Sequence, residues 1–176
     1  MIFTETNLSG AFIIELEKHE DSRGFFARSW DGNVFKEHGL VSEVIQQNTS
    51  FTIHKGTIRG MHYQVAPHQE TKLIKCLRGA IYDVIIDLRP DSTTYMQWFG
   101  IELSAENYKM IYVPKDFAHG FQTLEKDTLA TYLVTEIFTP HAERGIRYND
   151  PAIGIEWPLP VSFISNKDAS LPDFTK

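Results

Sequence analysis

The sequence lacks the features that mark secreted and membrane proteins. It has one cysteine, Cys76, in 176 residues, so no disulfide bond can form within the chain. No apolar segment approaches the length of about 20 residues that a membrane-spanning helix requires. Residues 1–6 contain neither the basic segment nor the apolar segment of a signal peptide. We therefore expect a cytoplasmic protein without a membrane segment, in which Cys76 is a small core residue rather than a reactive thiol.

Positive charge is also scarce. The chain has 17 lysine and arginine residues against 23 aspartate and glutamate residues, so its formal net charge at pH 7 is −6. A nucleic-acid-binding surface needs a basic patch, and we expect no nucleic-acid partner. A phosphate-bearing small ligand remains compatible with this charge, because a few arginines within a pocket can outweigh a mildly acidic exterior.

No internal repeat or linker interrupts the chain, and we predict a single domain over residues 1–176. Short segments rich in β-branched and aromatic residues are separated by Gly, Pro, Asp and Asn. We predict strands at residues 11–16, 25–30, 42–47, 56–64, 71–77, 80–88, 98–103, 109–113, 117–123 and 129–138. A short helix is predicted over residues 33–39, with Asn33 as its N-cap and Gly39 at its end. This pattern is typical of an all-β jelly roll or closed barrel, which can hold one ligand among inward-facing side chains.

Polar residues in two consecutive predicted strands mark a candidate site. Arg59, His62 and Lys72 lie close together in the sequence, among apolar residues. In a regular strand Arg59 and His62 point to opposite faces, so they can reach one ligand only if the strand is bulged or twisted there, which Gly60 permits. A lone histidine in a strand is more often structural. The arginine, the lysine and a second histidine at His119 favour a functional interpretation here.

Other polar residues allow two interpretations each. Lys72 alternates with apolar residues and is either a buried cation or a lysine whose ammonium group reaches solvent. The amides of residues 46–48 could bind a ligand or cap a loop. His119, which precedes a glycine in an apolar segment, could line a pocket or be a satisfied core histidine. By pattern alone Tyr132 is a core or surface aromatic residue, and Asp168 is a solvated loop charge.

A series of short motifs occurs in order along nearly the whole chain. They include Asp21-x-Arg23-Gly-Phe-Phe26, Gln46-x-Asn48-x-Ser50, Arg59-Gly-Met-His62-Tyr-Gln64, Gly79-x-x-x-Asp83-Val, Val113-Pro-x-x-Phe-Ala-His119-Gly-Phe121, Asn149-Asp150-Pro and Ile164-Ser-x-Lys167-Asp168. Together these motifs resemble those of the dTDP-4-dehydrorhamnose 3,5-epimerase family, the sugar-nucleotide epimerases of the rhamnose pathway. The resemblance implies a cupin-type jelly roll with a few short helices, a homodimer with exchanged N-terminal strands, and catalysis without cofactor or metal.

The resemblance also implies roles for individual residues. His62 matches the catalytic base, Asp168 the carboxylate that orients it, Tyr132 the proton donor and Lys72 the cation that stabilises the oxyanion. Positions that match other ligand-binding residues of the family are Arg23, Gln46, Gln47, Asn48, Arg59, His119, Glu143 and Lys167.

Two candidate substrate-binding residues depart from the family pattern. Arg28 stands where a glutamate that contacts the nucleotide is usual, and Phe138 stands where a tyrosine near the sugar is usual. The implied reaction is epimerisation of a nucleotide-linked 4-keto-6-deoxyhexose at C3, C5 or both, of the type that converts dTDP-4-dehydro-6-deoxy-D-glucose to dTDP-4-dehydro-L-rhamnose.

These residue types suit that chemistry. Loss of a proton next to a ketone puts negative charge on the carbonyl oxygen, so the reaction needs a base with a pKa near neutrality, and a histidine provides one. A carboxylate on the other imidazole nitrogen selects the tautomer and favours the imidazolium that forms. A cation stabilises the enolate, and inversion requires a proton from the opposite face.

Two rival functions remain at this point. One is a metal-dependent cupin enzyme, in which His62, Glu70 and His119 could hold a metal, although Gln64 stands where a second closely spaced histidine is expected. The other is a sugar-nucleotide-binding cupin that has lost catalysis. Metal analysis and deuterium exchange into the substrate distinguish these alternatives.

Overall fold

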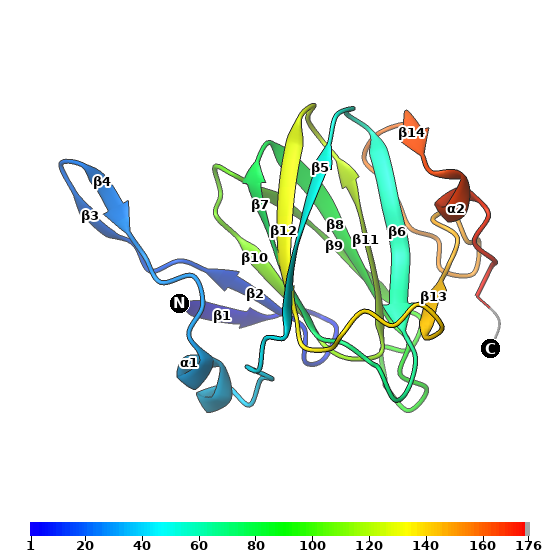
Figure 1. The fold of residues 1–176 in the computed structure, drawn as a ribbon, viewed down its shortest axis with the longest axis horizontal. Coiled ribbons are helices and arrows are strands. Elements are labelled where there is room, and N and C mark those ends of the chain that lie inside the picture. Colours follow the sequence, from blue (N-terminus) through cyan, green and yellow to red (C-terminus); the bar gives the residue numbers. More distant parts are fainter. Residues whose placement is uncertain (175–176) are drawn as a thin grey trace.

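The computed structural model describes residues 1–174 and forms two β-sheets that pack face to face (Figure 1). The last two residues of the predicted domain, 175–176, lie outside the described residues. The first sheet has the order β1 (Ile2–Glu5), β2 (Phe12–Glu15), β10 (Met110–Val113), β7 (Lys72–Arg78), β12 (Thr128–Val134) and β5 (Gln46–Thr52). The second has the order β13 (Glu143–Gly145), β6 (Thr57–Gln64), β11 (Phe117–Thr123), β8 (Ala80–Asp87) and β9 (Trp98–Ser104).

The remaining elements lie at the edges of this sandwich. Strand β14 (Phe163–Ile164) pairs in parallel with β6, and β3 (His19–Asp21) and β4 (Gly24–Phe26) form a separate hairpin. The two helices are short: α1 (Gly32–Glu37) and α2 (Asn166–Ala169). The predicted all-β jelly roll with a few short helices is therefore confirmed. Within residues 1–174 neither helix is long and apolar enough to cross a membrane.

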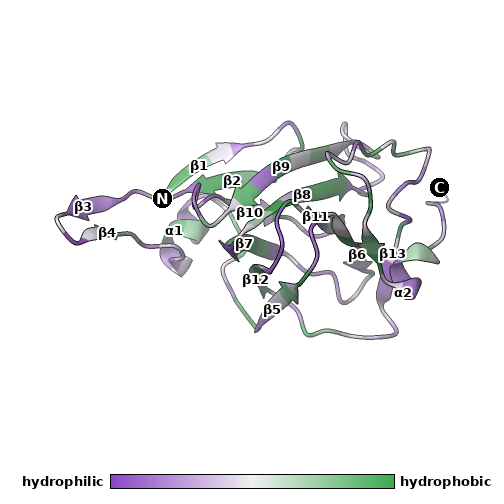
Figure 2. Cartoon of the chain, turned by 90° about the horizontal axis from the view of Figure 1, so that it is seen from above, coloured by the Kyte–Doolittle hydropathy of each residue, from purple (hydrophilic) through white to green (hydrophobic). Residues whose placement is uncertain are grey.

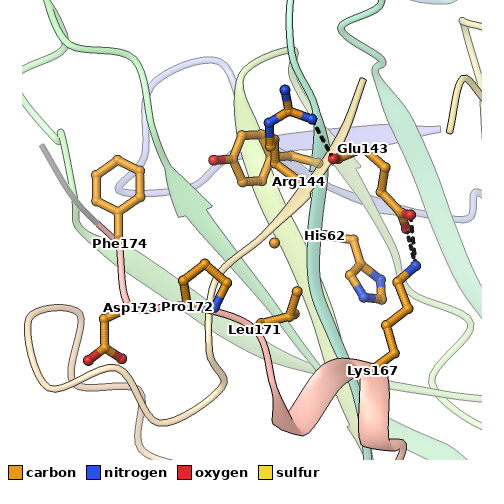
Figure 3. Close-up of a pocket in the computed structure, with 10 residues that line it drawn as sticks. His62, Glu143, Arg144, Lys167, Leu171, Pro172, Asp173 and Phe174 are labelled. Atoms are coloured by element: carbon orange, nitrogen blue, oxygen red, sulfur yellow. Dashed lines mark hydrogen bonds and ion pairs between the residues drawn. The ribbon is translucent and has the colours of Figure 1, made fainter. Parts of the chain in front are cut away.

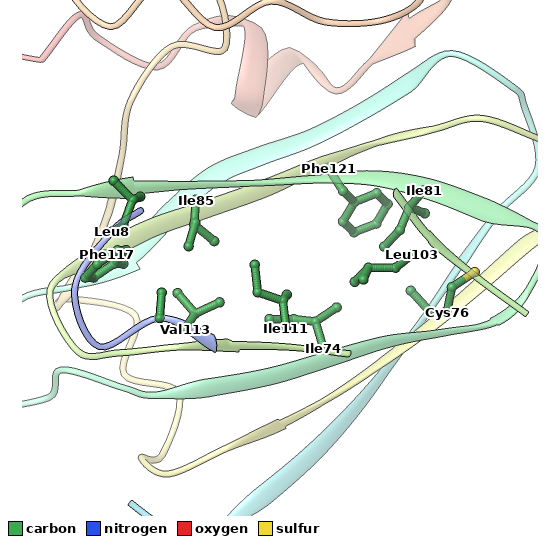
Figure 4. Packing of buried hydrophobic residues seen from close by; sticks show 12 residues of the cluster. Leu8, Ile74, Cys76, Ile81, Ile85, Leu103, Ile111, Val113, Phe117 and Phe121 are labelled. Carbon is green, nitrogen blue, oxygen red and sulfur yellow. The ribbon is translucent and has the colours of Figure 1, made fainter. Parts of the chain in front are cut away.

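The main core lies between the two sheets. Side chains from both inner faces point toward one another, among them Ile74 and Cys76 from β7 and Ile81 and Ile85 from β8 (Figure 4). Figure 2 shows that hydrophobic residues gather in the strands of the sheets. Cys76 is a buried core residue, as predicted, and burial raises the pKa of its thiol to about 11. The thiol is therefore protonated near neutral pH and is a poor nucleophile.

The inward-facing residues of β7 and β8 include polar as well as apolar side chains. Lys72 precedes Ile74 and Cys76 in the alternation of β7, and Asp83 stands between Ile81 and Ile85 in that of β8. Both Lys72 and Asp83 are buried. The interior of the sandwich is thus apolar in one part and charged in another, and the charged part contains the candidate site.

Several predicted boundaries are wrong. Residues 42–45 and 135–138 are not strands. The N–H of Phe138, for example, donates to a side-chain oxygen, Gln46 Oε1, at 2.9 Å, and not to the backbone of a neighbouring strand. The predicted strand at 25–30 is only the short β4, since the hairpin projects from the body, where no further strand among residues 1–174 is paired with it (Figure 1). Helix α1 is capped by Asp31 rather than Asn33, because the Asp31 carboxylate accepts the N–H of Asn33 at 3.0 Å.

Candidate active site

A bulge in β6 brings Arg59 and His62 to one cavity. His119 of β11 is opposite His62, whereas Phe121 is opposite Arg59, so the register shifts between these pairs. Gly60, at the shift, has φ +121°, and a Cβ there would lie 2.6 Å from the Cα of Gly120. Only glycine fits this close approach. Of the two distortions considered, a bulge or a twist, the strand has the bulge, and Arg59 and His62 both line a cavity of about 200 Å³.

The imidazole of His62 is paired with Asp168. Asp168 Oδ1 lies 2.8 Å from His62 Nε2, and its Oδ2 accepts the N–H of Gly60 at 3.3 Å. Ser165 caps the first turn of α2 by accepting the N–H of Asp168, which fixes the carboxylate. The interpretation of Asp168 as a solvated loop charge is wrong, because its side chain is only 7% exposed. The C-terminal segment that carries Asp168 therefore folds back onto β6.

The electrostatics keep Asp168 ionised. Burial acts to raise the pKa of this carboxyl group, but hydrogen bonds from His62 and the Gly60 N–H outweigh burial and lower the pKa below its ordinary value. The carboxylate can therefore accept the N–H of the imidazole and stabilise the imidazolium form. The dyad has the arrangement of a general base with its orienting group.

Lys72 is a buried cation rather than a lysine that reaches solvent. Its side chain is 10% exposed, and its Nζ lies 3.0 Å from Glu70 Oε1. Lys72 shares the cavity of about 200 Å³ with His62 and Tyr132. Sequence reasoning considered Glu70 only as a metal ligand. Its position two residues before Lys72, in a loop, gave no indication of the ion pair.

Tyr132 lies in the sheet opposite His62 and lines the same cavities, so it is a site residue as well as a core aromatic. Burial raises the pKa of its hydroxyl, the charge of Glu70 raises this pKa further, and Arg59 opposes the rise. The phenol is therefore protonated near neutral pH. It can donate a proton from the sheet that faces the base.

His119 forms a second pair with a buried carboxylate that sequence reasoning missed. Asp83 Oδ2 lies 2.8 Å from His119 Nε2, and within residues 1–174 the other oxygen, Oδ1, has no hydrogen-bond partner. Burial raises the pKa of Asp83, while His119 and Lys72 counteract part of this effect. His119 is therefore a buried histidine with a hydrogen-bond partner, and it also lines the cavity of about 200 Å³. The sequence held one signal that the Asp83 side chain faces the interior: it alternates in β8 with Ile81 and Ile85, which are core residues.

A larger cavity of about 390 Å³ adjoins the first and has His62, Lys72 and Tyr132 in common with it. A volume of this size suits a small ligand. Of the predicted substrate-binding residues, it is lined by Gln46, Asn48, Phe138 and Glu143. The amides of Gln46 and Asn48 thus face a cavity.

A further cavity of about 390 Å³ lies between His62 and the C-terminal segment (Figure 3). Glu143 of β13 and Lys167 of α2 meet at its wall, where Lys167 Nζ is 2.7 Å from both carboxylate oxygens of Glu143. His62 therefore lines this cavity as well as the two described above. The predicted residues Glu143 and Lys167 are brought together beside it.

Three predicted substrate-binding residues lie elsewhere in the chain. Gln47 is on the outer face of its sheet, as strand alternation with Gln46 requires, and its Nε2 donates to Thr131 Oγ1 at 3.2 Å. Arg23 is on the projecting hairpin, 88% exposed and paired with Asp21. Arg28 is 63% exposed and its Nη1 lies 2.8 Å from Asp31 Oδ2. The fold does not bring these side chains to the His62 of their own chain.

The amide of Gln64 has a structural role. Its Nε2 donates to the carbonyl oxygens of His68 (2.9 Å) and Ile137 (3.2 Å), and its Oε1 accepts the N–H of Thr139 (2.6 Å). It therefore ties together two loops at the cavity mouth, one of which carries Phe138. In residues 1–174, no three His, Cys, Asp or Glu side chains form a group that could hold a metal ion.

A family model described as dTDP-4-dehydrorhamnose 3,5-epimerase matches residues 5–176. The chain belongs to this epimerase family. A dTDP-4-dehydrorhamnose 3,5-epimerase of Methanothermobacter thermautotrophicus is 41% identical over 169 residues, which are 94% of this chain and 90% of the relative. Membership of the epimerase family, expected from the motifs, is confirmed.

Solved structures of epimerases extend this likeness to three dimensions. The dTDP-4-dehydrorhamnose 3,5-epimerase of Bacillus anthracis, with TDP and PPi bound, has a TM-score of 0.94 and 42% identity, covering 98% of this chain and 99% of that chain. A dTDP-6-deoxy-D-glucose-3,5-epimerase of Legionella pneumophila, in complex with dTDP-4-keto-L-rhamnose, has a TM-score of 0.91 and 36% identity, covering 98% and 92% of the two chains.

Proposed function

We propose that this protein epimerises dTDP-4-dehydro-6-deoxy-D-glucose at C3 and C5 to dTDP-4-dehydro-L-rhamnose. The observation that carries the proposal is the pairing of His62 with Asp168 on one sheet, across a cavity from Tyr132 on the other. Inversion at carbon needs a base and an acid on opposite faces of the sugar ring. Two facing sheets are a direct way to supply them.

The first step is proton abstraction by His62. The imidazole takes the proton from the carbon next to the 4-keto group, and the Asp168 carboxylate stabilises the resulting imidazolium. The electron pair of the C–H bond moves to the keto oxygen, which becomes an enolate. The Lys72 ammonium group stabilises that oxygen, and loss of one such donor costs about 3–4 kcal/mol of transition-state stabilisation.

The second step is proton return by Tyr132. The phenol is protonated near neutral pH and lines the cavity from the sheet that faces His62. It delivers a proton to the other face of the carbon, and the configuration is inverted. His62 then releases its proton to solvent and Tyr132 takes one up, so repetition of the two steps at the second carbon flanking the ketone yields the doubly inverted sugar. Proton transfer by these side chains requires neither a cofactor nor a metal.

Substrate contacts are proposed for the polar residues that line the cavities and for one aromatic residue, Phe138. The residues concerned are Arg59, His119, Gln46, Asn48, Phe138, Glu143 and Lys167. The Arg59 guanidinium and the Lys167 ammonium groups suit the diphosphate of a nucleotide sugar. Gln47, Arg23 and Arg28 are proposed to contact substrate only in an assembly of two chains.

We infer a homodimer with exchanged N-terminal strands. The hairpin β3–β4 extends away from the body (Figure 1), and its adjacent aromatic side chains Phe25 and Phe26 are 38% and 68% exposed. Two adjacent exposed aromatic side chains on a projecting arm suit a protein partner. Exchange of these arms between two chains would carry Arg23 and Arg28 toward the partner's cavity. We also propose a cytoplasmic location, which the scarcity of cysteine favours.

The test is an NMR time course with the 4-keto-6-deoxyglucose nucleotide in deuterated water. Deuterium at both C3 and C5, together with the doubly inverted product, is the expected result. His62→Ala is the matched control and should show no exchange. A wild-type protein that binds the nucleotide sugar without exchange would instead be a binding protein, and activity lost on chelation would indicate a metal enzyme.

A further inference from the structure

Glu70 is a charged side chain within the site to which the reaction above assigns no role. It stands in the loop between β6 and β7, two residues before Lys72. Its side chain is 13% exposed and lines the same cavity as His62 and Tyr132. A carboxylate that loses its hydration needs a partner, and Lys72 Nζ is that partner at 3.0 Å.

The backbone around Glu70 is held on both sides. Gln64 Nε2 donates to the carbonyl oxygen of His68 at 2.9 Å, and the N–H of Thr71 donates to Thr135 Oγ1 at 2.9 Å. The N–H of Thr135 donates in return to the carbonyl oxygen of Thr71 at 3.2 Å. Because these bonds fix the chain before and after it, Glu70 has a defined position. It can therefore also hold the Lys72 ammonium group in a defined position.

We propose that Glu70 is a positioning residue, whose carboxylate holds the Lys72 ammonium group at the wall of the cavity that His62 and Tyr132 share. The inference rests on the proposed epimerisation, in which Lys72 stabilises the enolate oxygen. Lysine has a long, flexible stem, and a cation that is ordered before the reaction stabilises a developing oxyanion without a cost of reorganisation. The ion pair with Glu70 orders the Lys72 ammonium group before substrate binds.

Glu70 also acts on the acid of the second step. Burial raises the pKa of the Tyr132 hydroxyl, Glu70 raises it further, and Arg59 lowers it. The other charged or titratable side chains that line these two cavities are Lys72, His62, His119, Tyr63, Glu143 and Asp168. Removal of the Glu70 charge should lower the pKa of Tyr132, so the phenol would lose its proton at a lower pH than in the wild type.

The test compares the wild type with Glu70→Gln, which removes the charge and preserves the size of the side chain. NMR of isotope-labelled protein should show a Lys72 ammonium signal in the wild type, assigned with Lys72→Met, because the buried ion pair slows its proton exchange. We expect this signal to be lost in Glu70→Gln. The kcat for epimerisation should fall about 5- to 150-fold with KM nearly unchanged, and the basic limb of the pH profile should move to lower pH.

Two further variants control this comparison. Glu15→Gln removes a surface partner of Lys109, whose Nζ is 3.6 Å from Glu15 Oε1, and should leave kcat and the pH profile unchanged. Glu70→Asp keeps the charge on a shorter side chain, so it should lower kcat while the basic limb stays nearer its wild-type position. Should Glu70→Gln fail to fold, Glu70→Asp with the Lys72 signal still tests the contact.

The outcomes separate this inference from the proposed function. A folded Glu70→Gln variant with the wild-type Lys72 signal, kcat and pH profile overturns the role of Glu70. If the wild type shows no deuterium exchange, the proposed epimerisation fails. The Lys72 signal then still decides whether Glu70 holds the ammonium group.

Discussion

Asp168 and His62 are 106 residues apart in the sequence, yet Asp168 Oδ1 lies 2.8 Å from His62 Nε2. The contact forms because α2 packs beside β6, where the N–H of Gly60 donates to the other carboxylate oxygen. A base that is oriented from a separate element can be tested by removing either member of the pair.

We expect His62→Ala to abolish deuterium exchange at both C3 and C5, because no other group is proposed to remove the proton. Asp168→Asn should keep a hydrogen bond to the imidazole but favour the wrong tautomer, so kcat should fall by about a hundredfold or more. The measurement is deuterium incorporation in the NMR time course. Near-normal incorporation by His62→Ala would show that another residue is the base.

For Tyr132→Phe, exchange and inversion should separate. Proton abstraction needs only His62 and Lys72, so deuterium should still enter the substrate, whereas little inverted product should form without the acid on the opposite face. Both quantities are read from one NMR time course. If exchange and inversion fall by the same factor, Tyr132 positions the sugar rather than protonating it. Tyr63→Phe, on the same cavity wall as His62, is a control that should preserve inversion.

Arg28 is expected to affect nucleobase preference. A glutamate can accept the ring N–H of thymine or uracil, but an arginine only donates and suits an acceptor such as the unprotonated ring nitrogen of cytosine. In the single chain Arg28 is paired with Asp31, so binding must compete with that ion pair. We expect Arg28→Glu to shift preference toward thymidine and uridine diphosphates over cytidine diphosphate by about tenfold or more.

The measurement for Arg28 is calorimetric titration of the three nucleotides into the wild type and Arg28→Glu. Arg28→Ala controls for loss of the ion pair with Asp31 without introducing a carboxylate. The same ranking and ratios in all three proteins would show that Arg28 does not read the base.

Asp87 should contribute to the acid stability of the fold. Burial acts to raise the pKa of its carboxyl group, but hydrogen bonds from Arg89, Ser92 and Thr94 lower it from 3.8 to about 2. A carboxyl group with a lowered pKa stabilises the folded state above its unfolded pKa, and this contribution is lost as the pH falls from about 4 to about 2. We therefore expect the free energy of unfolding to decrease as the pH is lowered through this window.

In Asp87→Asn the pH dependence of stability between about pH 4 and pH 2 should be weaker, and stability at neutral pH should be lower. Urea unfolding at several pH values measures both effects. Asp91→Asn, at an exposed position nearby, is the matched control. An unchanged slope in Asp87→Asn would mean that other carboxylates govern acid unfolding.

The sequence by itself determined the class of fold and indicated the central residues of the candidate site. Alternation of apolar and polar residues is a local property, so it predicted the strands β6, β7, β8 and β11 and the inward direction of Lys72. Gly60 indicated the bulge that lets Arg59 and His62 share a cavity, because only a residue without a Cβ fits there. Motifs in order along the chain indicated the family.

The motifs implied the pair His62–Asp168, but the tertiary structure alone decided which other charged groups meet. Alternation tells which face a side chain takes but not which distant residue lies opposite, and that partner depends on strand order and register. The pairs His62–Asp168 and His119–Asp83 join separate elements of the fold. Glu70 lies in a loop, where no periodicity predicts direction, and its ion pair with Lys72 follows from the hydrogen bonds that hold that loop against its neighbours.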